Sequence, residues 1–191
     1  MSRKNANGSS ITDLVGATPV VRLDGSLPSI WKFPELGAET FKAGEMVCLS
    51  GSAGNAVGLA TPGTDASGFG ILGFAADNAS AATSSFKSVY VASPDVVFCA
   101  NIGHSTVSAT AQTAATDLGQ RYGLTSLSGR TYVDKLKTNA STVMVRVLGL
   151  CDQDTHPSFY GRVLFHVLPT ACQLGSPWQV SNGSAITATV V

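Results

Sequence analysis

Residues 142–150, with the sequence TVMVRVLGL, decide the fold class of this 191-residue chain. Val143, Val145 and Val147 occupy alternate positions, which is the two-residue period of a β-strand with one face turned to a core. Residues 161–169, GRVLFHVLP, repeat this alternation of apolar and polar side chains. Two segments of this kind close together in the chain predict a β-rich domain.

Further strands are expected in short apolar segments that end at turn-forming residues, namely 46–49, 71–75, 88–92 and 95–102. The connections between them are rich in Gly, Ser, Thr and Asn, which suit tight turns. Residues 106–118 predict a short helix, because they are rich in Ala and precede Gly119, a possible C-cap. We therefore expect a mainly β fold, a compact β-sandwich or barrel-like domain with one short helix.

The first 40 residues indicate an extended N-terminal arm. Three prolines between residues 19 and 34 stop helices and favour extended chain. Trp31, Phe33 and Leu36 lie in this stretch with no periodic pattern around them. We expect these three apolar side chains to be buried against another protein surface.

The domain is expected to span residues 41–174, followed by a C-terminal tail over residues 175–191. Trp178 and Val180 precede the dipeptide NG at 182–183, which is typical of tight turns. We count both residues among the candidate contacts. Residues 186–191, ITATVV, read as a strand, and a lone terminal strand exposes backbone groups that must pair with a sheet of its own chain or of a neighbour.

Charged residues are scarce. They make up 13% of the chain, against about 25% in an average soluble domain. The 12 basic and 12 acidic residues give a formal net charge of zero. A surface of small uncharged residues suits a protein held in an assembly, although a charge-poor monomer is the alternative.

The charge pattern disfavours nucleic acid as a partner, because Lys87 is the only basic residue between Lys42 and Arg121. Residues 47–64 are uncharged but too rich in Gly, Ser, Asn and Pro to read as a membrane-spanning helix. The N-terminal MSRKNANGSS has no apolar signal-peptide region. We therefore expect no membrane partner and assembly in the cytoplasm.

The four cysteines, Cys48, Cys99, Cys151 and Cys172, are far apart and form no C-x-x-C pair. A zinc site requires closer spacing of its ligands. Reduced, buried thiols are the favoured interpretation, because disulfides are rare in a reducing compartment. Two disulfides remain the alternative.

Motifs that carry chemistry are weak. Gly68, Gly70 and Gly73 spell G-x-G-x-x-G, but the segment upstream reads as a loop, whereas a dinucleotide site needs a strand before the motif and a helix after it. The chain has no G-x-S-x-G nucleophile elbow, and its histidines lack partners at set spacings. Asp152 and Asp154 are too few for a calcium loop. We expect no catalytic residue, no metal and no cofactor.

The order of segments resembles a known family. FKAGEMVCLSG (41–51), GFGILGFAADNAS (68–80), KSVYVASPDVVFCANI (87–102), TAATDLGQRYGL (113–124) and TYVDK (131–135) precede the two alternating strands. This order is similar to that of the β-rich decoration, or cement, proteins of tailed bacteriophages, especially those with a β-tulip domain. The resemblance covers roughly residues 41–171 and includes no diagnostic motif.

The resemblance implies a virion structural protein that coats the exterior of the expanded capsid. Its expected partners are the major capsid protein and two further copies of itself in a homotrimer, and the family has no catalytic residues. The alternatives are a carbohydrate-recognition module of a phage fibre, a phage tail or a host surface, and a hydrolase. A major shell protein is disfavoured, because the chain is short and lacks a long helical segment.

Overall fold

The computed structural model describes residues 16–50, 56–60, 70–82, 85–103, 111–127, 129–151 and 158–174. Nearly all regular structure in these residues is β, which confirms the expected fold class. The first six strands are β1 (Thr18–Arg22), β2 (Ile30–Pro34), β3 (Met46–Ser50), β4 (Ala56–Leu59), β5 (Gly73–Ala75) and β6 (Phe86–Val91). The remaining strands are β7 (Val96–Gly103), β8 (Gln112–Thr113), β9 (Arg121–Leu127), β10 (Arg130–Asp134), β11 (Val145–Leu150), β12 (Ser158–Phe159) and β13 (Arg162–Val167).

Five of these strands form a closed barrel in the order β7-β10-β9-β11-β13, with β13 pairing back to β7. The two alternating segments identified in the sequence, β11 and β13, are antiparallel neighbours in this barrel. Strand β7 closes the barrel, and we call it the barrel seam. One edge of β7 pairs with β13, while its other edge pairs with β1 in the first half and with β10, in parallel, at Ile102 and Gly103.

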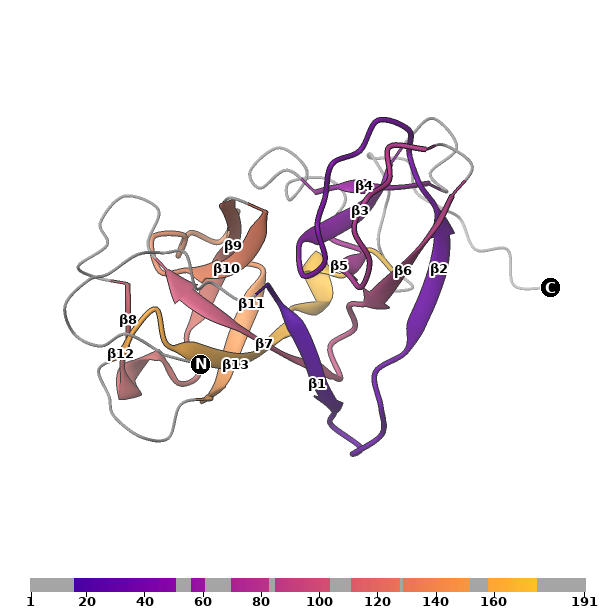
Figure 1. The fold of residues 1–191 in the computed structure, drawn as a ribbon. Helices are drawn as coiled ribbons and strands as arrows, with labels where there is room; N and C mark the ends of the chain where they lie inside the picture. The colour runs from indigo at the N-terminus through magenta and orange to yellow at the C-terminus, as the bar shows by residue number, and fades with distance from the viewer. Residues whose placement is uncertain are drawn as a thin grey trace.

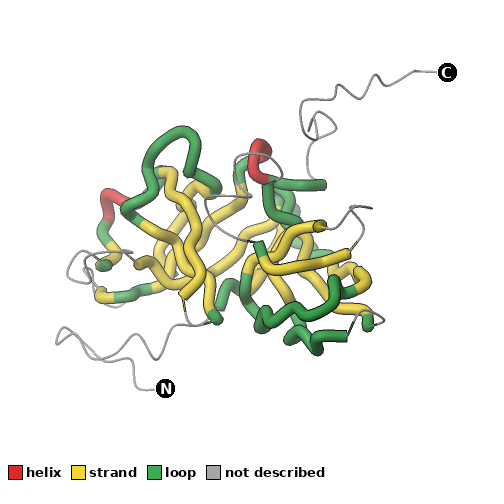
Figure 2. Tube along the Cα trace, turned by 90° about the horizontal axis from the view of Figure 1, so that it is seen from above, coloured by secondary structure: helices red, strands yellow, loops and turns green. Residues whose placement is uncertain are grey.

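A second sheet has the order β2-β6-β5-β3-β4 and is antiparallel throughout. Its outer strands approach each other, because a bridge joins Glu35, directly after β2, to Val57 in β4. The Leu36 N–H donates to the Val57 carbonyl at 2.9 Å. Figures 1 and 2 show the barrel and the second sheet as two lobes side by side.

The chain passes between the two lobes three times. It starts at the barrel with β1, builds the second sheet with β2–β6, and returns to the barrel for β7–β13. After the 3-10 turn Pro169–Ala171, a parallel bridge joins Cys172 to Ile71 of the second lobe. The Gln173 side chain then bonds both backbone groups of Leu49, accepting from its N–H at 2.7 Å and donating to its carbonyl at 3.1 Å.

One hydrophobic core spans both lobes. Phe74 of β5 lies against Phe98 of β7 and Phe165 of β13, with ring centroids 4.7 and 6.0 Å away. All three rings are fully buried. A smaller cluster fills the inside of the second sheet around Phe41 and Val89. In β13 the buried face follows from the alternation of side chains, because Val163, Phe165 and Val167 are buried and the residues between them are half-buried.

The expected helix over residues 106–118 is wrong for the part of this range that the structure describes. Gln112 and Thr113 form strand β8, which pairs with β12, and a 3-10 turn, Ala115–Asp117, follows. Thr lowers helix propensity, so the tertiary pairing with β12 prevails over the local preference.

The described part of the N-terminal arm is extended, as expected, but it belongs to both lobes. Strand β1 lies on the barrel seam and β2 is an outer strand of the second sheet. The tail over residues 175–191, with Trp178 and Val180, lies outside the described residues. Cys48, Cys99 and Cys172 are buried as expected, whereas Cys151 is half-buried.

Candidate interaction surface

The β1–β2 segment, residues 18–34, exposes more large apolar side chains than any other described stretch of this length. Leu27 is 85% exposed, Leu23 66% and Trp31 54%. Val20 and Ile30 belong to the same stretch and are also exposed. In Figure 1 the connection between β1 and β2 projects away from both lobes at the bottom of the view. Exposed apolar side chains gathered on one projecting element are typical of a protein-binding surface.

The turn that carries Leu23 is held in one conformation by hydrogen bonds. Arg22 N–H donates to the Ser26 carbonyl at 3.0 Å, and Gly25 N–H donates to the Arg22 carbonyl at 2.8 Å. One carboxylate oxygen of Asp24 accepts from the Ser26 N–H at 2.9 Å and from its hydroxyl at 2.6 Å. Gly25 adopts a φ of 83°, which glycine takes without steric cost.

An ion pair anchors this turn to the barrel. The Arg22 guanidinium contacts Asp95, with Nε to Oδ2 at 2.7 Å, and Leu23 N–H donates to the Asp95 carbonyl at 2.7 Å. The hydrogen bond from Ser93 lowers the pKa of Asp95, burial opposes this, and Arg22 lowers it further. The exposed leucines are thus presented by an ordered element, so binding them does not require ordering a loose loop.

The predicted contact residues Trp31, Phe33 and Leu36 come together on and directly after β2, but only Trp31 is widely exposed. The Trp31 and Phe33 rings stack with centroids 6.4 Å apart. Phe33 packs against the core of the second sheet, and Leu36 is half-buried beside the Val57 bridge. Phe33 and Leu36 therefore support the sheet, while Trp31 is the residue of the three that is largely exposed to solvent.

The outer edge of β2 carries backbone groups that point away from β6. Val91 N–H donates to the Ser29 carbonyl and Glu35 N–H donates to the Ser85 carbonyl. Because inward and outward groups alternate along an antiparallel strand, Ile30 and Lys32 direct their N–H and C=O groups to the outer edge. Pro34 has no N–H to offer there, which limits pairing by other strands to the first half of β2.

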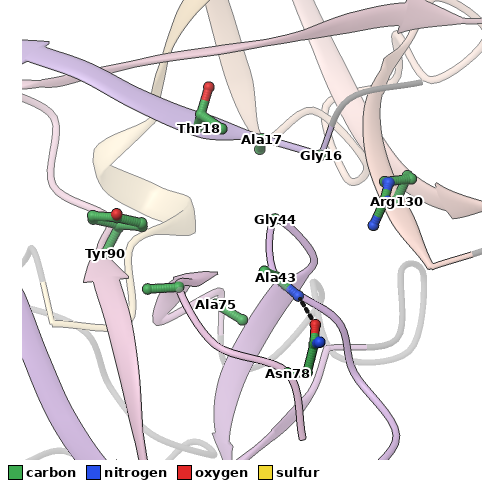
Figure 3. A pocket seen from close by; sticks show the side chains of 10 residues that line it. Gly16, Ala17, Thr18, Ala43, Gly44, Ala75, Asn78, Tyr90 and Arg130 are labelled. Atoms are coloured by element: carbon green, nitrogen blue, oxygen red, sulfur yellow. Dashed lines mark hydrogen bonds between the residues drawn. The ribbon is translucent and has the colours of Figure 1, made fainter. Parts of the chain in front are cut away.

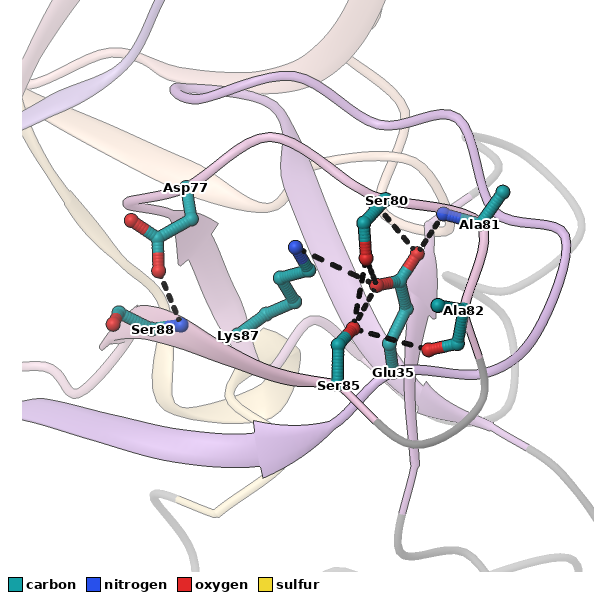
Figure 4. A network of polar contacts seen from close by, with 8 residues as sticks. All are labelled: Glu35, Asp77, Ser80, Ala81, Ala82, Ser85, Lys87 and Ser88. Carbon is teal, nitrogen blue, oxygen red and sulfur yellow. Dashed lines mark hydrogen bonds and ion pairs between the residues drawn. The ribbon is translucent and has the colours of Figure 1, made fainter.

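Glu35 fixes the end of β2 from inside. Its carboxylate accepts from the Ser80 N–H at 2.8 Å, from the Ser80 hydroxyl at 2.6 Å and from the Ala81 N–H at 2.6 Å. It also accepts from the Ser85 hydroxyl, and Lys87 Nζ lies 3.6 Å away. Figure 4 shows these groups converging on the carboxylate. Burial raises the pKa of Glu35, but the hydrogen bonds outweigh burial and lower the pKa to about 2.

A shallow depression of about 450 Å³ lies where the two lobes meet (Figure 3). Its wall consists mostly of backbone and of alanine methyl groups. In this wall Gly16 and Gly44 approach each other so closely that a Cβ on Gly44 would lie 2.6 Å from the Gly16 Cα. The Asn78 amide oxygen on its rim accepts from the Ala43 N–H at 2.9 Å. Arg130 is the one charged residue in the lining, which offers neither a nucleophile–base pair nor a set of metal ligands.

A row of basic side chains lies on the outer face of the barrel and was missed by sequence reasoning. Arg146 of β11 is the register partner of Arg121 in β9 and of His166 in β13. The three residues lie far apart in the chain, so only the strand pairing brings them together. Their row is too short to follow a nucleic-acid backbone.

Asp117, in the 3-10 turn before β9, is a buried carboxylate that accepts from Tyr122 OH at 2.8 Å, from Ala114 N–H at 2.7 Å and from Lys135 Nζ at 2.8 Å. Burial, and then Asp117, raise the pKa of Tyr122 well above its usual value. The members of this network bond to one another and to the Gln112 carbonyl, so the network stabilises the end of the barrel.

The described ranges contain no cluster of three or more His, Cys, Asp or Glu side chains that could hold a metal ion. Within those same ranges, no helix has the length and apolar character to cross a membrane.

Sequence reasoning missed Leu23 and Leu27 as surface residues and Glu35 as a buried anchor. The signal for the leucines is their place in RLDGSLPS, where turn-forming Asp24, Gly25 and Pro28 surround them. Glu35 gives no such signal, because its partners at residues 80–85 are distant in sequence. A family-model scan, a search of curated proteins and a search of solved structures each find no match to this chain.

Proposed function

We propose that this protein is a structural subunit that binds the outer surface of an assembled tailed-phage capsid and stabilises contacts between major capsid protein subunits. It acts as a binding protein without catalytic activity. The β1–β2 segment is the attachment surface, with Leu23, Leu27 and Trp31 as the side chains that a capsid subunit buries.

The observation that carries this proposal is an ordered, projecting element with exposed apolar side chains, in a chain with very few charged residues. Leu23 and Leu27 are largely exposed to water, which does not stabilise an isolated soluble protein. Hydrogen bonds and the Arg22–Asp95 ion pair nevertheless hold the turn that carries them in place. An attached capsid surface would bury these side chains and supply the missing apolar contacts.

The mechanism is stabilisation by mass action. A subunit that binds the assembled shell, but not dissociated capsid protein, shifts the equilibrium toward the shell by an amount set by its concentration relative to its dissociation constant. The outer edge of β2 at Ile30 and Lys32 adds a second mode of contact, because a strand of the partner pairs with those backbone groups.

The test uses the full chain and expanded capsids assembled from the major capsid protein encoded in the same genome. The subunits are expected to co-sediment with the capsids and to raise the temperature at which the capsids disassemble. Leu27→Asp is expected to weaken binding at least tenfold, since it places a charge at the centre of a desolvated contact.

Leu136→Asp is the matched control, because Leu136 is another exposed leucine in a turn, on the barrel and away from β1 and β2. It should bind as the unchanged chain does. Equal binding by both variants would disprove the role of the β1–β2 segment, and no co-sedimentation of the unchanged chain would disprove capsid binding.

A carbohydrate-recognition module is the second candidate, and the stacked Trp31 and Phe33 rings favour it, because sugars pack on exposed aromatic faces. A glycan array with Trp31 fluorescence in a Trp178→Phe background distinguishes the two functions. Saturable quenching by a glycan, together with no capsid binding, would support this candidate over the first.

A further inference from the structure

We propose that Cys99 and Cys151 form a disulfide that cross-links strand β7 to the end of strand β11. Their sulfur atoms lie 2.6 Å apart, although 52 positions separate the two residues in the chain. Two sulfur atoms that are not bonded to each other pack further apart than this. The inference rests on the barrel alone and is independent of capsid binding.

Strand β13 lies between β7 and β11, and it aligns the two cysteines on one face. Cys99 is the register partner of Leu164 on one edge of β13. Cys151 N–H donates to the Arg162 carbonyl at 2.9 Å on the other edge. Leu164 and Arg162 both belong to the outward-facing set of β13, so Cys99 and Cys151 face the outside of the barrel.

The path of β11 brings its end toward Cys99. The register of β11 against β13 shifts between Val147 and Gly149, which is a β-bulge. A bulge bends its strand and increases the local twist. The chain then bends at Cys151, directly after β11 ends at Leu150.

The other two cysteines are placed differently. The Cys48 thiol lies 3.9 Å from the Leu59 carbonyl, and the Cys172 thiol lies 3.8 Å from the Val167 carbonyl. Both belong to the shared core. Burial raises the pKa of Cys172 to about 12, so this thiol stays protonated and unreactive. The geometry thus selects one pair among the four cysteines.

The reaction is thiol–disulfide exchange with a low-molecular-weight disulfide such as oxidised glutathione. Cys151, the more exposed of the two, loses its proton and attacks one glutathione sulfur, which forms a mixed disulfide and releases one glutathione thiolate. Cys99 then loses its proton and attacks the Cys151 sulfur, which releases the second glutathione. The protein loses two protons and two electrons, and the oxidant is reduced to two glutathione molecules.

The test treats the folded full chain with oxidised glutathione and analyses the protein after removal of the reagent. The intact mass is expected to fall by about 2 Da, the thiols titrated in denaturant to fall from four to two, and digestion to yield one peptide pair joined through Cys99 and Cys151. The midpoint of thermal unfolding should be about 4 to 16 °C higher for the oxidised form than for the reduced form.

Cys48→Ala is the matched control and should still lose two thiols on oxidation, whereas Cys151→Ser should lose none. Retention of four thiols by the unchanged chain, a pairing other than Cys99 with Cys151, or a disulfide-linked dimer through Cys151 would each overturn the inference. These outcomes are measured on the unchanged chain and do not depend on whether the variants fold.

Discussion

At the scale of single residues, Glu35 shows how a buried carboxylate is tolerated. The side chain is fully buried, and burial of a charged group is costly unless hydrogen bonds replace the lost water. Ser80, Ala81 and Ser85 supply those bonds from a turn, and Ala81 adopts a φ of 57° to bring its N–H into place. The carboxylate therefore holds the turn and the end of β2 in one arrangement.

We predict that stability falls as the pH is lowered from about 5 to about 2. In the unfolded chain a glutamate has a pKa near 4.3, whereas the folded pKa of Glu35 is about 2. A carboxyl group whose pKa is lowered by folding stabilises the protein above its unfolded pKa and loses this contribution as the pH falls through the folded value. Urea unfolding followed from pH 7 to pH 2 measures the loss.

Glu35→Gln isolates this contribution. The amide keeps the shape but replaces one acceptor with a donor that faces the N–H and O–H donors of the turn, so the variant should lose about 1–3 kcal/mol at pH 7. Its stability should also vary less with pH between 5 and 2 than that of the unchanged chain. Parallel pH profiles for the two proteins would show that Glu35 is not the titrating group.

At the scale of elements, strands marked by alternating or continuous apolar side chains were predictable, whereas β9 and β10, which have buried residues but mixed sequences, were not predicted as strands. Strands β11 and β13 follow directly from their alternating side chains, and β3, β6 and β7 were found as short apolar segments. Strands β1 and β2 were predicted only as extended chain, because their prolines and exposed side chains give no sign in the sequence that they pair with β7 and β6. Strand β4 lies in a Gly-rich stretch that reads as a loop, and it is defined by its pairing with β3 and its bridge to Glu35, both of which depend on tertiary structure.

The candidate surface was predictable to a smaller degree than the fold. Trp31 was identified because an aromatic residue in a proline-rich stretch has no core of its own. The exposure of Leu23 and Leu27 depends on the turn conformation at residues 22–26, which local sequence suggests but does not determine. The basic row of Arg121, Arg146 and His166 depends on strand order, which no local pattern contains.

Gln173 gives a prediction for element β3. Its side chain bonds both backbone groups of Leu49 beyond the point where β5 stops pairing with β3, and so it takes the place of a neighbouring strand. We expect Gln173→Ala to lower the free energy of unfolding by about 1–3 kcal/mol, because the Leu49 groups lose their partners. Gln173→Glu keeps the acceptor for the Leu49 N–H and loses the donor to its carbonyl.

Hydrogen exchange of the Leu49 amide measures this effect locally. It should become faster in Gln173→Ala and stay closer to the unchanged rate in Gln173→Glu, because the acceptor remains in the second variant. Equal protection of the Leu49 amide in Gln173→Ala and the unchanged chain would contradict the role assigned to this side chain.

At the scale of the whole molecule, the two lobes are one folding unit. Strand β1, at the start of the described chain, pairs with barrel strand β7, and the second sheet receives residues 171–173 from the end of the described chain. The Thr131 hydroxyl of β10 also accepts from the Met46 N–H of β3 at 2.9 Å. Separating the lobes would therefore break backbone pairing at both ends of the chain and open the shared core.

This arrangement predicts a single cooperative unfolding transition. In a Trp178→Phe background, Trp31 fluorescence reports on the second sheet, whereas far-ultraviolet circular dichroism reports on the strands of both lobes. The two signals should give coincident denaturant midpoints, because neither lobe keeps a complete core without the other. Two separated midpoints would mean that the lobes unfold independently.

Phe74→Ala is a second test of whether the two lobes unfold together, because Phe74 belongs to the second sheet but packs against barrel residues Phe98 and Phe165. Loss of a fully buried ring should cost about 3–5 kcal/mol, through lost burial and the cavity that remains. Since the ring contributes to both lobes, the fluorescence and circular dichroism midpoints should fall together and by the same amount. Phe41→Ala is a further test, because Phe41 lies in the separate core of the second sheet. It should also lower both midpoints by the same amount, because the second sheet holds its shape only together with the barrel, and a fall in the fluorescence midpoint alone would contradict a single folding unit.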